Sequence, residues 1–246
     1  MLISFRRKIS KSPSRSHLFT LKTRCVVFAV LISGVASSFA QSSVCYGSPN
    51  KGRVEQAVQL PSSGPNFSAY SAIGVNLGRT YVHTAVRDVL VAVFANLERT
   101  HPAKVFVYGE TGLKEGGLFR PHRTHQNGLS VDVMIPVIDK KGNSVALPTS
   151  ISNKFGYDIE FDPQARFDGL AIDFEALGVF LHEVRTVSKL QKIDISLVIF
   201  DPQYLPQLFA TQHGKELSTE LNFMRKPAWV RHDEHIHIDF SVPCKK

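Results

Sequence analysis

The sequence predicts an α+β fold: a single small domain with a mainly antiparallel sheet flanked by helices. Two long amphipathic stretches and several short apolar runs succeed one another along the chain, without internal repeats. About 206 residues follow an apolar leader, a length that suits one domain with a full hydrophobic core. We therefore divide the chain into a leader, residues 1–40, and one folded domain, residues 41–246.

The leader has the pattern of a secretory signal peptide. Residues 1–24 contain seven basic side chains and no acidic one, and residues 25–40 form an uncharged, mostly apolar run that ends in Ser38-Phe39-Ala40. This run is shorter than the ~20 residues that span a bilayer comfortably. An uncleaved membrane anchor is the alternative. We predict cleavage near Ala40 and a periplasmic domain without stable membrane insertion.

Most of the net charge also comes from this leader. The whole chain carries a formal +8, from 29 Lys and Arg against 21 Asp and Glu. Without the seven basic residues of the leader, 22 basic residues remain against 21 acidic ones, a net charge of +1. The high isoelectric point is therefore no indication of a nucleic-acid partner, and we expect none.

Two cysteines remain after the leader, one near each end of the predicted domain. Cys25 belongs to the leader, whereas Cys45 and Cys244 follow it. In an oxidising compartment these two would pair in a disulfide and tie the termini together. The alternative is two free thiols on frayed ends.

The first half of the domain is predicted to contain an extended segment, a helix and a strand. Residues 46–80 are rich in Gly, Pro and Ser and are expected to wrap over the domain. Residues 81–101 have a broad apolar stripe of helical period, and residues 103–108 form a strand. His83 is expected to cap the helix or to lie on the surface. The Gly-rich residues 113–117 are expected to form a loop over the site.

The second half adds strands around a second long helix. Residues 171–190 carry the apolar stripe of that helix, and the strongly apolar residues 193–200 suit a central strand. The other predicted elements are a strand at 133–137, a hairpin turn at 139–143, a strand at 157–161, a loop or short helix at 202–211, and a helical turn at 216–224.

Two histidine-rich segments, residues 121–132 and 231–240, hold five of the ten histidines. From His235 onward, polar and apolar residues alternate, which is the period of a half-buried strand. His235 and His237 therefore share one face, ~6.6 Å apart along the strand. Histidines interleaved with carboxylates are typical of a metal site.

The first segment needs a turn to take part in the same site. His125 and Asp132 are seven residues apart, and in an unbroken strand an odd offset would place them on opposite faces. Asn127-Gly128 supplies a turn that brings both to one side. A His, a carboxylate and a second His leave the fourth position of a tetrahedral zinc ion free for water, as in a catalytic site. A group of satisfied structural histidines is the alternative.

The order His125-x6-Asp132 and later His235-x-His237 resembles the metal-binding pattern of the LAS peptidases, the zinc enzymes of bacterial cell-wall metabolism. The pair of motifs in this order, in an exported chain, is specific. The resemblance implies a small LAS-peptidase-like α+β domain that binds one zinc ion, Zn(2+).

His122 and His232 narrow the resemblance to one branch of these enzymes. With them, the chain is most similar to the penicillin-insensitive murein endopeptidases, which carry His-x-x-His in both places. The likeness extends to residues 107–112 and 199–202, and it covers roughly residues 47–240.

The resemblance also implies a role for each motif residue. The zinc ligands would be His125, Asp132 and His237. His235 would be the base that takes the proton of the attacking water and passes it to the leaving amine. His122 and His232 would line the cleft as further catalytic groups, orienting substrate or supporting the tetrahedral intermediate. For these two, a purely structural role is the alternative.

Five further side chains are expected to support the ligands or to contact substrate: Glu110, Asp233, Glu234, Asp239 and Arg123. Asp233 and Glu234 are predicted to hydrogen-bond a ligand imidazole, or else to form a solvated charge pair. Asp239 shares the face of the two histidines and is expected to support a ligand or pair with a cation. Glu110 is expected beside the metal-bound water or the substrate amine. Arg123 is expected to hold a substrate carboxylate or to lie on the surface.

We therefore predict an exported zinc metallopeptidase that hydrolyses peptide cross-links of peptidoglycan. By resemblance, the bond is D-alanyl–meso-diaminopimelate, and β-lactams do not inhibit because no serine forms an acyl-enzyme. A related zinc D-Ala-D-Ala carboxypeptidase or dipeptidase is one alternative, for which Arg123 would hold the free carboxylate. A catalytically silent peptidoglycan-binding domain is another. His235 beside His237 argues against it, because a structural zinc site needs four protein ligands and no base.

Overall fold

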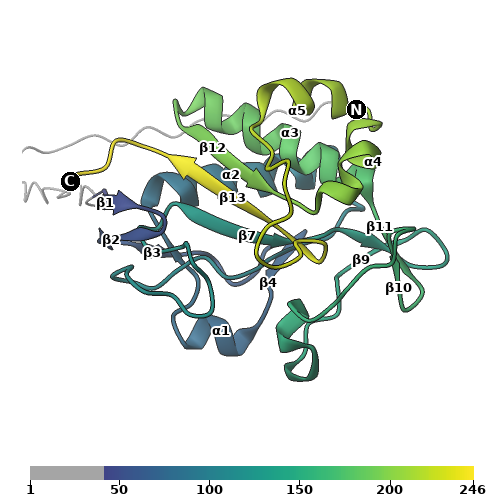
Figure 1. Cartoon of the computed structure of the whole chain (residues 1–246), viewed down its shortest axis with the longest axis horizontal. Coiled ribbons are helices and arrows are strands. Elements are labelled where there is room, and N and C mark those ends of the chain that lie inside the picture. The colour runs from purple at the N-terminus through teal and green to yellow at the C-terminus, as the bar shows by residue number, and fades with distance from the viewer. Residues whose placement is uncertain (1–41) are drawn as a thin grey trace, which may run out of the picture. The chain divides into compact units, whose positions relative to one another are not determined.

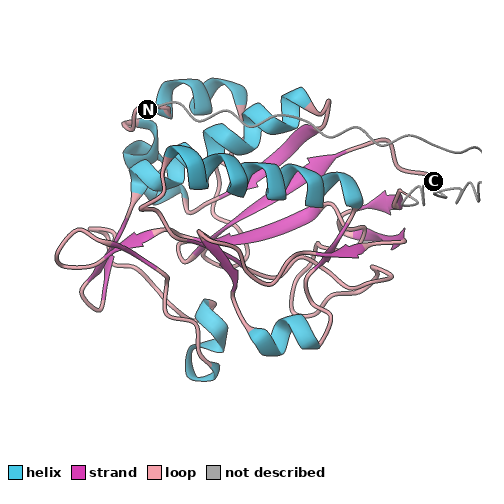
Figure 2. Cartoon of the chain, turned by 180° about the vertical axis from the view of Figure 1, so that it is seen from behind, coloured by secondary structure: helices cyan, strands magenta, loops and turns pink. Residues whose placement is uncertain are grey.

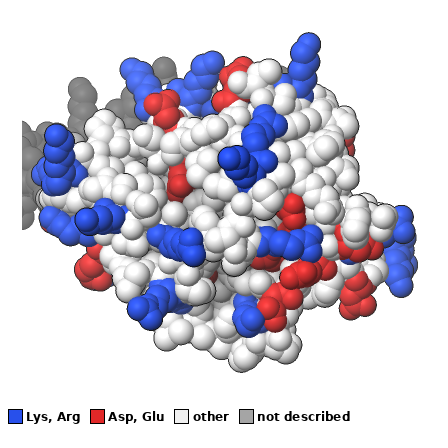
Figure 3. Space-filling model, in the orientation of Figure 1, with Lys and Arg blue, Asp and Glu red and all other residues white. Residues whose placement is uncertain are grey.

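A computed structural model describes residues 42–246 of the chain (Figures 1 and 2). The predicted signal peptide, with Cys25, lies outside these residues. The described residues form an α+β fold, as predicted, with the long helices in front of the central sheet in Figure 2. On the face seen in Figure 3, basic and acidic side chains are interspersed without a continuous surface of one sign.

The central sheet has five strands in the order β12-β13-β7-β6-β4. Only β4 and β6 are parallel, and the other neighbours are antiparallel. The strands are β4 (Phe67–Ala69), β6 (Phe106–Tyr108), β7 (Ser130–Met134), β12 (Asp194–Ile199) and β13 (His235–Ser241). The register between β13 and β7 sets His237 opposite Asp132. The sheet therefore joins the two histidine-rich segments directly.

The prediction that residues 193–200 form a central strand is wrong, because β12 lies at the edge of the sheet. Its free edge is covered by the segment after α5 (Gly214–Glu220), through hydrogen bonds from Val198 to Asn222 and from Met224 to Val198. Val198 and Ile199 are buried because that covering segment and helix α3 (Phe174–Leu190) enclose them. An apolar run therefore marks a covered strand, not necessarily a central one.

Helices α2 (Thr84–Thr100) and α3 pack against each other. Each begins three residues later than predicted, because short strands precede them: β5 (Tyr81–Val82) and β11 (Leu170–Ile172). Side chains fix both starts. His83 accepts a hydrogen bond from the Ala85 amide, and Asp173 accepts one from the Ala176 amide. The expected capping role of His83 is confirmed.

Residues 157–161 do not form the predicted strand. They follow the 3₁₀ segment η1 (Ile151–Gly156), and the amide of Phe161 donates to the carboxylate of Asp233 instead of to a neighbouring strand. The predicted strand at 133–137 is also divided into β7 and β8 (Val137–Ile138). The break falls at Pro136, which has no backbone N–H to continue the ladder.

The remaining elements are short. The segment 46–80, predicted to be extended, contains short strands but also a helix, and the turn at 139–143 joins β8 to its antiparallel partner β9. The short elements are β1 (Val44–Ser48), β2 (Lys51–Glu55), β3 (Val58–Gln59), α1 (Ala72–Asn76), β9 (Ser144–Val145), β10 (Arg166–Phe167), η2 (Pro202–Tyr204), α4 (Leu205–Phe209) and α5 (Gly214–Glu220). Within residues 42–246, no helix has the length and apolar character needed to cross a membrane.

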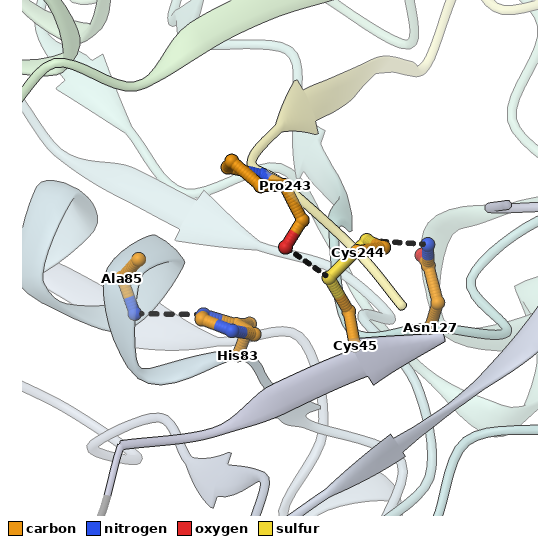
Figure 4. The surroundings of a disulfide bond; sticks show 6 residues. All are labelled: Cys45, His83, Ala85, Asn127, Pro243 and Cys244. Carbon is orange, nitrogen blue, oxygen red and sulfur yellow. Dashed lines mark hydrogen bonds between the residues drawn. A yellow bond between two sulfur atoms is a disulfide. The ribbon is translucent and has the colours of Figure 1, made fainter. Parts of the chain in front are cut away.

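The predicted pairing of Cys45 and Cys244 is confirmed by a disulfide bond (Figure 4). Backbone hydrogen bonds between Gly47 and Lys245, and between Lys245 and Cys45, run alongside it. The amide of Asn127 also lies 3.9 Å from the Cys244 sulfur. The tail after β13 is thus attached both to β1 and to the loop that carries the first histidine-rich segment.

Candidate metal centre

The loop before β7 turns sharply and brings the side chain of His125 to Asp132. Gly128 has φ +76°, and a Cβ there would lie 2.9 Å from the backbone nitrogen of His83, so this turn requires glycine. His125 itself has a positive φ of 67°. As a result His125 Nε2 lies 3.2 Å from Asp132 Oδ1, and both side chains are fully buried. The predicted turn at Asn127-Gly128 therefore does bring the two together.

His237 reaches the same carboxylate oxygen from the neighbouring strand. Its Nδ1 lies 2.9 Å from Asp132 Oδ1. Ligands around a tetrahedral metal at ~2.0–2.1 Å are separated by ~3.3 Å, so these spacings are close to those of a metal-bound set. His125 Nδ1 lies 3.1 Å from the Thr111 carbonyl, to which it can donate, while the buried Nε2 has no hydrogen-bond partner within residues 42–246. His125 and His237 therefore each lie at a spacing from Asp132 that suits two ligands of one divalent metal ion.

His122 lies close enough to be a further donor. The donor atoms of His122, His125 and Asp132 lie within 4.8 Å of one another, a group that does not include His237. However, His122 Nδ1 faces the other carboxylate oxygen of Asp132, at 3.6 Å. We prefer His237 as the third ligand, because its Nδ1 converges with His125 on a single oxygen. His122 then lies beside the metal position, at the wall of the cleft.

The imidazole of His237 is held between two carboxylates. Its Nε2 lies 2.9 Å from Asp239 Oδ1, and Asp239 in turn accepts a hydrogen bond of 2.5 Å from Ser130. Burial lowers the pKa of His237, but the hydrogen bonds to Asp132 and Asp239 overcome this and raise the pKa to about 10. Without a metal, His237 is therefore protonated at neutral pH. The support that Asp239 was expected to give a ligand is seen as a direct contact.

Metal binding at this centre is expected to release about one proton per ion. The burial of His125 lowers its pKa, and the neighbouring imidazoles hold the pKa of Asp132 well below its usual range despite burial, so both are already deprotonated at pH 7. Only His237 has to lose a proton, so the apparent metal affinity should rise about tenfold per pH unit from pH 6.5 toward 9. Calorimetry in buffers of different ionisation enthalpy measures this release. A pH-independent affinity would contradict it.

The proton on His237 also stabilises the metal-free fold. The pKa of His237 is raised above the unfolded value of ~6.5, so its contribution is fully present below pH 6.5 and is lost as pH rises through about 10. Chelator-treated protein should therefore unfold more easily as the pH is raised through this window, whereas metal-loaded protein should not.

His235 lies next to the three predicted ligands on the cleft side. Its Nε2 is 3.8 Å from Asp132 Oδ2, and its Nδ1 is 2.7 Å from the carboxyl group of Glu234. Burial lowers the pKa of His235 to about 4 and raises the pKa of Glu234 to about 8, so the uncharged form of each is favoured. Glu234 thus contacts the imidazole beside the ligands instead of a ligand imidazole.

His232 is also neutral and points into the cleft. Burial is the largest cause that lowers its pKa, to about 4. Its Nδ1 lies 2.9 Å from the Val230 carbonyl, to which it donates, so Nε2 is left as an acceptor. In this state His232 can accept a hydrogen bond from a substrate N–H but cannot donate one to an oxyanion.

Glu110 is occupied by a network that the sequence did not indicate. It accepts hydrogen bonds from Tyr70 (2.8 Å), from His122 Nε2 (2.6 Å) and from Arg79. Burial raises its pKa, but the hydrogen bonds from Arg79 and His122 outweigh this and bring the pKa to about 2. Glu110 therefore orients His122, and it is not free for the predicted contact with metal-bound water or a substrate amine.

Asp233 and Arg123 also lie away from the metal ligands. Asp233 accepts from the Phe161 amide at 2.7 Å and pairs with Arg231 at 3.0 Å, so it fixes the cleft wall and contacts no ligand imidazole. Arg123 is exposed, and its guanidinium lies 5.2 Å from the ring centre of Trp229. Arg123 does not line the cleft.

Tyr157 is a site residue that sequence reasoning missed. Its buried hydroxyl donates to Asp132 Oδ2 at 3.0 Å and accepts from the Glu110 amide at 2.8 Å. Burial raises the pKa of Tyr157 well above its usual range, so this hydroxyl remains a donor. No motif spacing marks Tyr157, because η1 and the chain after it bring it to the site from outside both histidine-rich segments.

Replacing Tyr157 with Phe is expected to weaken metal binding by ~10–100-fold while leaving the fold intact. The substitution keeps the ring but removes the hydrogen bond that orients the second oxygen of Asp132, and losses of this kind have that magnitude. Competition with a chromophoric chelator measures the affinity. Tyr204→Phe is the matched control, because Tyr204 is also buried but its hydroxyl bonds to the carbonyls of Phe161 and Asp162 and to Arg231, away from Asp132. Equal affinities of the Tyr157→Phe and wild-type proteins would contradict the assigned role.

A cleft of about 590 Å³ opens above these residues, a volume suited to a small peptide. His122, His232, His235 and Trp229 line it. The Gly-rich segment 113–117, which was expected to form a loop over the site, does not line the cleft. It lies against β2, where the Val54 amide donates to the Glu115 carbonyl.

The fold and the site define a class: an α+β protein with a buried His/Asp metal-binding group at the base of a peptide-sized cleft. Residues 45–154 match the family model of the penicillin-insensitive murein endopeptidases, a family that acts on the cell wall. Over this span the chain is similar to that family, which confirms the predicted resemblance. The match includes His122, His125 and Asp132 and ends before β13. A search of curated proteins finds no match.

Proposed function

We propose that the protein is a zinc-dependent murein endopeptidase that hydrolyses D-alanyl–meso-diaminopimelate cross-links. The observation that carries this proposal is the convergence of His125 and His237 on one oxygen of Asp132, beside the neutral imidazole of His235. Two imidazoles and one carboxylate are a usual ligand set of catalytic zinc, and they leave one position open. When bound, zinc would polarise the scissile carbonyl and acidify the attacking water.

The chain's own residues would supply the proton transfers and the orientation of the peptide. His235 Nε2 is uncharged and can accept a proton from the attacking water, then return it to the leaving amine. Its contact with Glu234 holds the ring in place. His232 would orient a substrate N–H through its free Nε2, and His122, fixed by Glu110, would support the opposite wall.

The cations of the cleft favour an endopeptidase over a carboxypeptidase. The three Lys and Arg side chains in the described lining already pair with carboxylates: Arg79 with Glu110, Lys154 with Asp158, and Arg231 with Glu160, Asp201 and Asp233. Arg123 lies outside the lining. A carboxypeptidase needs a cation for the terminal carboxylate, and each cation of this lining is already balanced by a carboxylate of the protein.

We also infer that residues 1–40 are a signal peptide cleaved near Ala40, and that residues 41–246 act in the periplasm on cross-linked peptides. The disulfide between Cys45 and Cys244 supports an oxidising compartment. Edman or mass analysis of the protein recovered from cells would give the mature N-terminus, which is expected next to Ala40. Retention of the whole leader would contradict cleavage.

Digestion of purified muropeptide dimers, followed by mass spectrometry, tests the proposed reaction. Conversion of dimers to monomers that stops with EDTA and resumes with added Zn²⁺ is the expected result. Loss of a terminal D-Ala from intact dimers would instead identify the carboxypeptidase. Dimers that bind to the zinc-loaded, folded protein and remain uncut would identify a peptidoglycan-binding domain.

A further inference from the structure

A second group of metal-binding side chains lies outside the cleft, on the helical layer. The donor atoms of His182 in α3, His213 just before α5 and Glu216 in the first turn of α5 lie within 4.8 Å of one another. None of the three lines the cleft. α3 and α5 both lie in the upper part of Figure 1. This group therefore belongs to a different part of the domain from the centre around Asp132.

One nitrogen of this group lacks a hydrogen bond, as does one at the first centre. Among the described residues, two buried imidazole nitrogens have no hydrogen-bond partner: His125 Nε2 and His182 Nδ1. His182 Nδ1 lies 3.0 Å from Glu216 Oε2, but the contact lacks hydrogen-bond direction, just as that between His125 and Asp132 does. A buried nitrogen close to a carboxylate, without a hydrogen bond, is the arrangement that a cation between them would satisfy.

The carboxylate of Glu216 is fixed in a position that leaves one oxygen free for a cation. Arg185 Nη1 binds Glu216 Oε1 at 2.6 Å, and Arg185 also pairs with Glu220. Arg185 therefore holds Oε1 of Glu216, while Oε2 faces His182. The side chains of His182 and Glu216 are 29% and 35% exposed, so a cation from solution can reach them.

The histidines have the chemistry that a transition metal selects. Burial lowers the pKa of His213, and a neutral imidazole is the form that binds metal. The two rings stack 3.9 Å apart with 20° between their planes. One ring must rotate for both nitrogens to meet one ion, and the partial exposure of both residues permits that rotation. Imidazole and carboxylate donors suit Zn²⁺, Ni²⁺ or Cu²⁺ better than Ca²⁺ or Mg²⁺.

We propose that His182, His213 and Glu216 form a second site for a divalent transition-metal ion, which ties α3 to α5. Three protein ligands at a half-buried position leave the other coordination positions to water. The ion at this site exchanges more readily than one held at the buried centre. The site is independent of the proposed hydrolysis.

Zinc stoichiometry of the purified, untagged chain tests this proposal. Titration with Zn²⁺ alone, followed by calorimetry and by competition with a chelator, should give two ions per chain for the wild-type protein. Glu216→Gln should lower this to one ion and leave the cleavage of muropeptide dimers unchanged. Glu220→Gln is the matched control, because Glu220 lies on the same helix and shares Arg185, and it should retain two ions.

A second variant isolates the new site. His125→Ala, which lacks a ligand of the first centre, should still bind one zinc ion, and His125→Ala combined with Glu216→Gln should bind none. Circular dichroism checks that each variant is folded. A wild-type stoichiometry of one, or a Glu216→Gln protein that binds as much zinc as wild type, would overturn the proposal.

Discussion

Replacing Asp132 with Asn is expected to abolish both metal binding and hydrolysis. One oxygen of this fully buried carboxylate faces His125 at 3.2 Å and His237 at 2.9 Å. The amide of Asn has the same size but no negative charge. If its oxygen takes the shared position it is a weaker metal ligand, and if its nitrogen does it is no ligand. The metal affinity should fall by more than the ~100-fold that results from losing a residue that only hydrogen-bonds a ligand, and activity should fall with it.

The Asn variant should also be less stable when metal-free. The charged His237 would lose one of its two carboxylates inside the protein, and breaking a buried pair in this way costs ~3–5 kcal/mol. Metal content by mass spectrometry, thermal unfolding and dimer cleavage should be measured on the same samples. Asp88→Asn is the control, because Asp88 is exposed on α2 and pairs only with Arg87. Wild-type metal affinity in Asp132→Asn would exclude Asp132 as a ligand.

Replacing His235 with Ala is expected to separate catalysis from metal binding. His235 Nε2 lies 3.8 Å from Asp132 Oδ2 and does not share the oxygen on which the other two histidines converge. Loss of a general base typically reduces the rate by ~10²–10⁴-fold, so kcat for dimer cleavage should fall by that factor while one zinc remains bound at this centre. Rapid-quench assays with quantified muropeptides measure kcat.

His232→Ala is the matched comparison for His235→Ala. His232 is also neutral and lies in the cleft wall, but it is assigned to substrate orientation, so its loss should mainly raise KM. If His235→Ala protein loses its zinc, His235 is a ligand and not the base. If kcat is unchanged, the base lies elsewhere in the cleft.

The arrangement around Asp132 could be predicted because it depends on local patterns. The alternation from His235 to Asp239 predicts a strand with three polar groups on one face, and Asn127-Gly128 predicts the turn that returns His125 to Asp132. Both follow from backbone geometry over a few residues. Cys45 and Cys244 could likewise be paired because no other cysteine follows the leader.

The supporting residues could not be predicted, because their contacts depend on tertiary packing. Tyr157 and Arg79 lie in segments without regular periodicity. No sequence pattern connects Tyr157 to Asp132 or Arg79 to Glu110. Glu110 illustrates the same limit. Its place beside the site follows from β6, but its engagement with Arg79 depends on how the segment before α2 is positioned. The predicted starts of α2 and α3 are three residues too early, because the apolar residues of the short strand before each helix continue the apolar stripe of that helix.

The disulfide between Cys45 and Cys244 closes a ring that contains nearly all the described residues, because the two cysteines have a sequence separation of 199. Closing so long a loop stabilises the fold by ~5 kcal/mol in the chain-entropy model. The ring also changes the outcome of proteolysis. A single cut in an exposed turn such as 139–143 would leave two fragments that stay covalently joined. Asp132 and His237, although on opposite sides of that cut, would remain in one molecule and on paired strands.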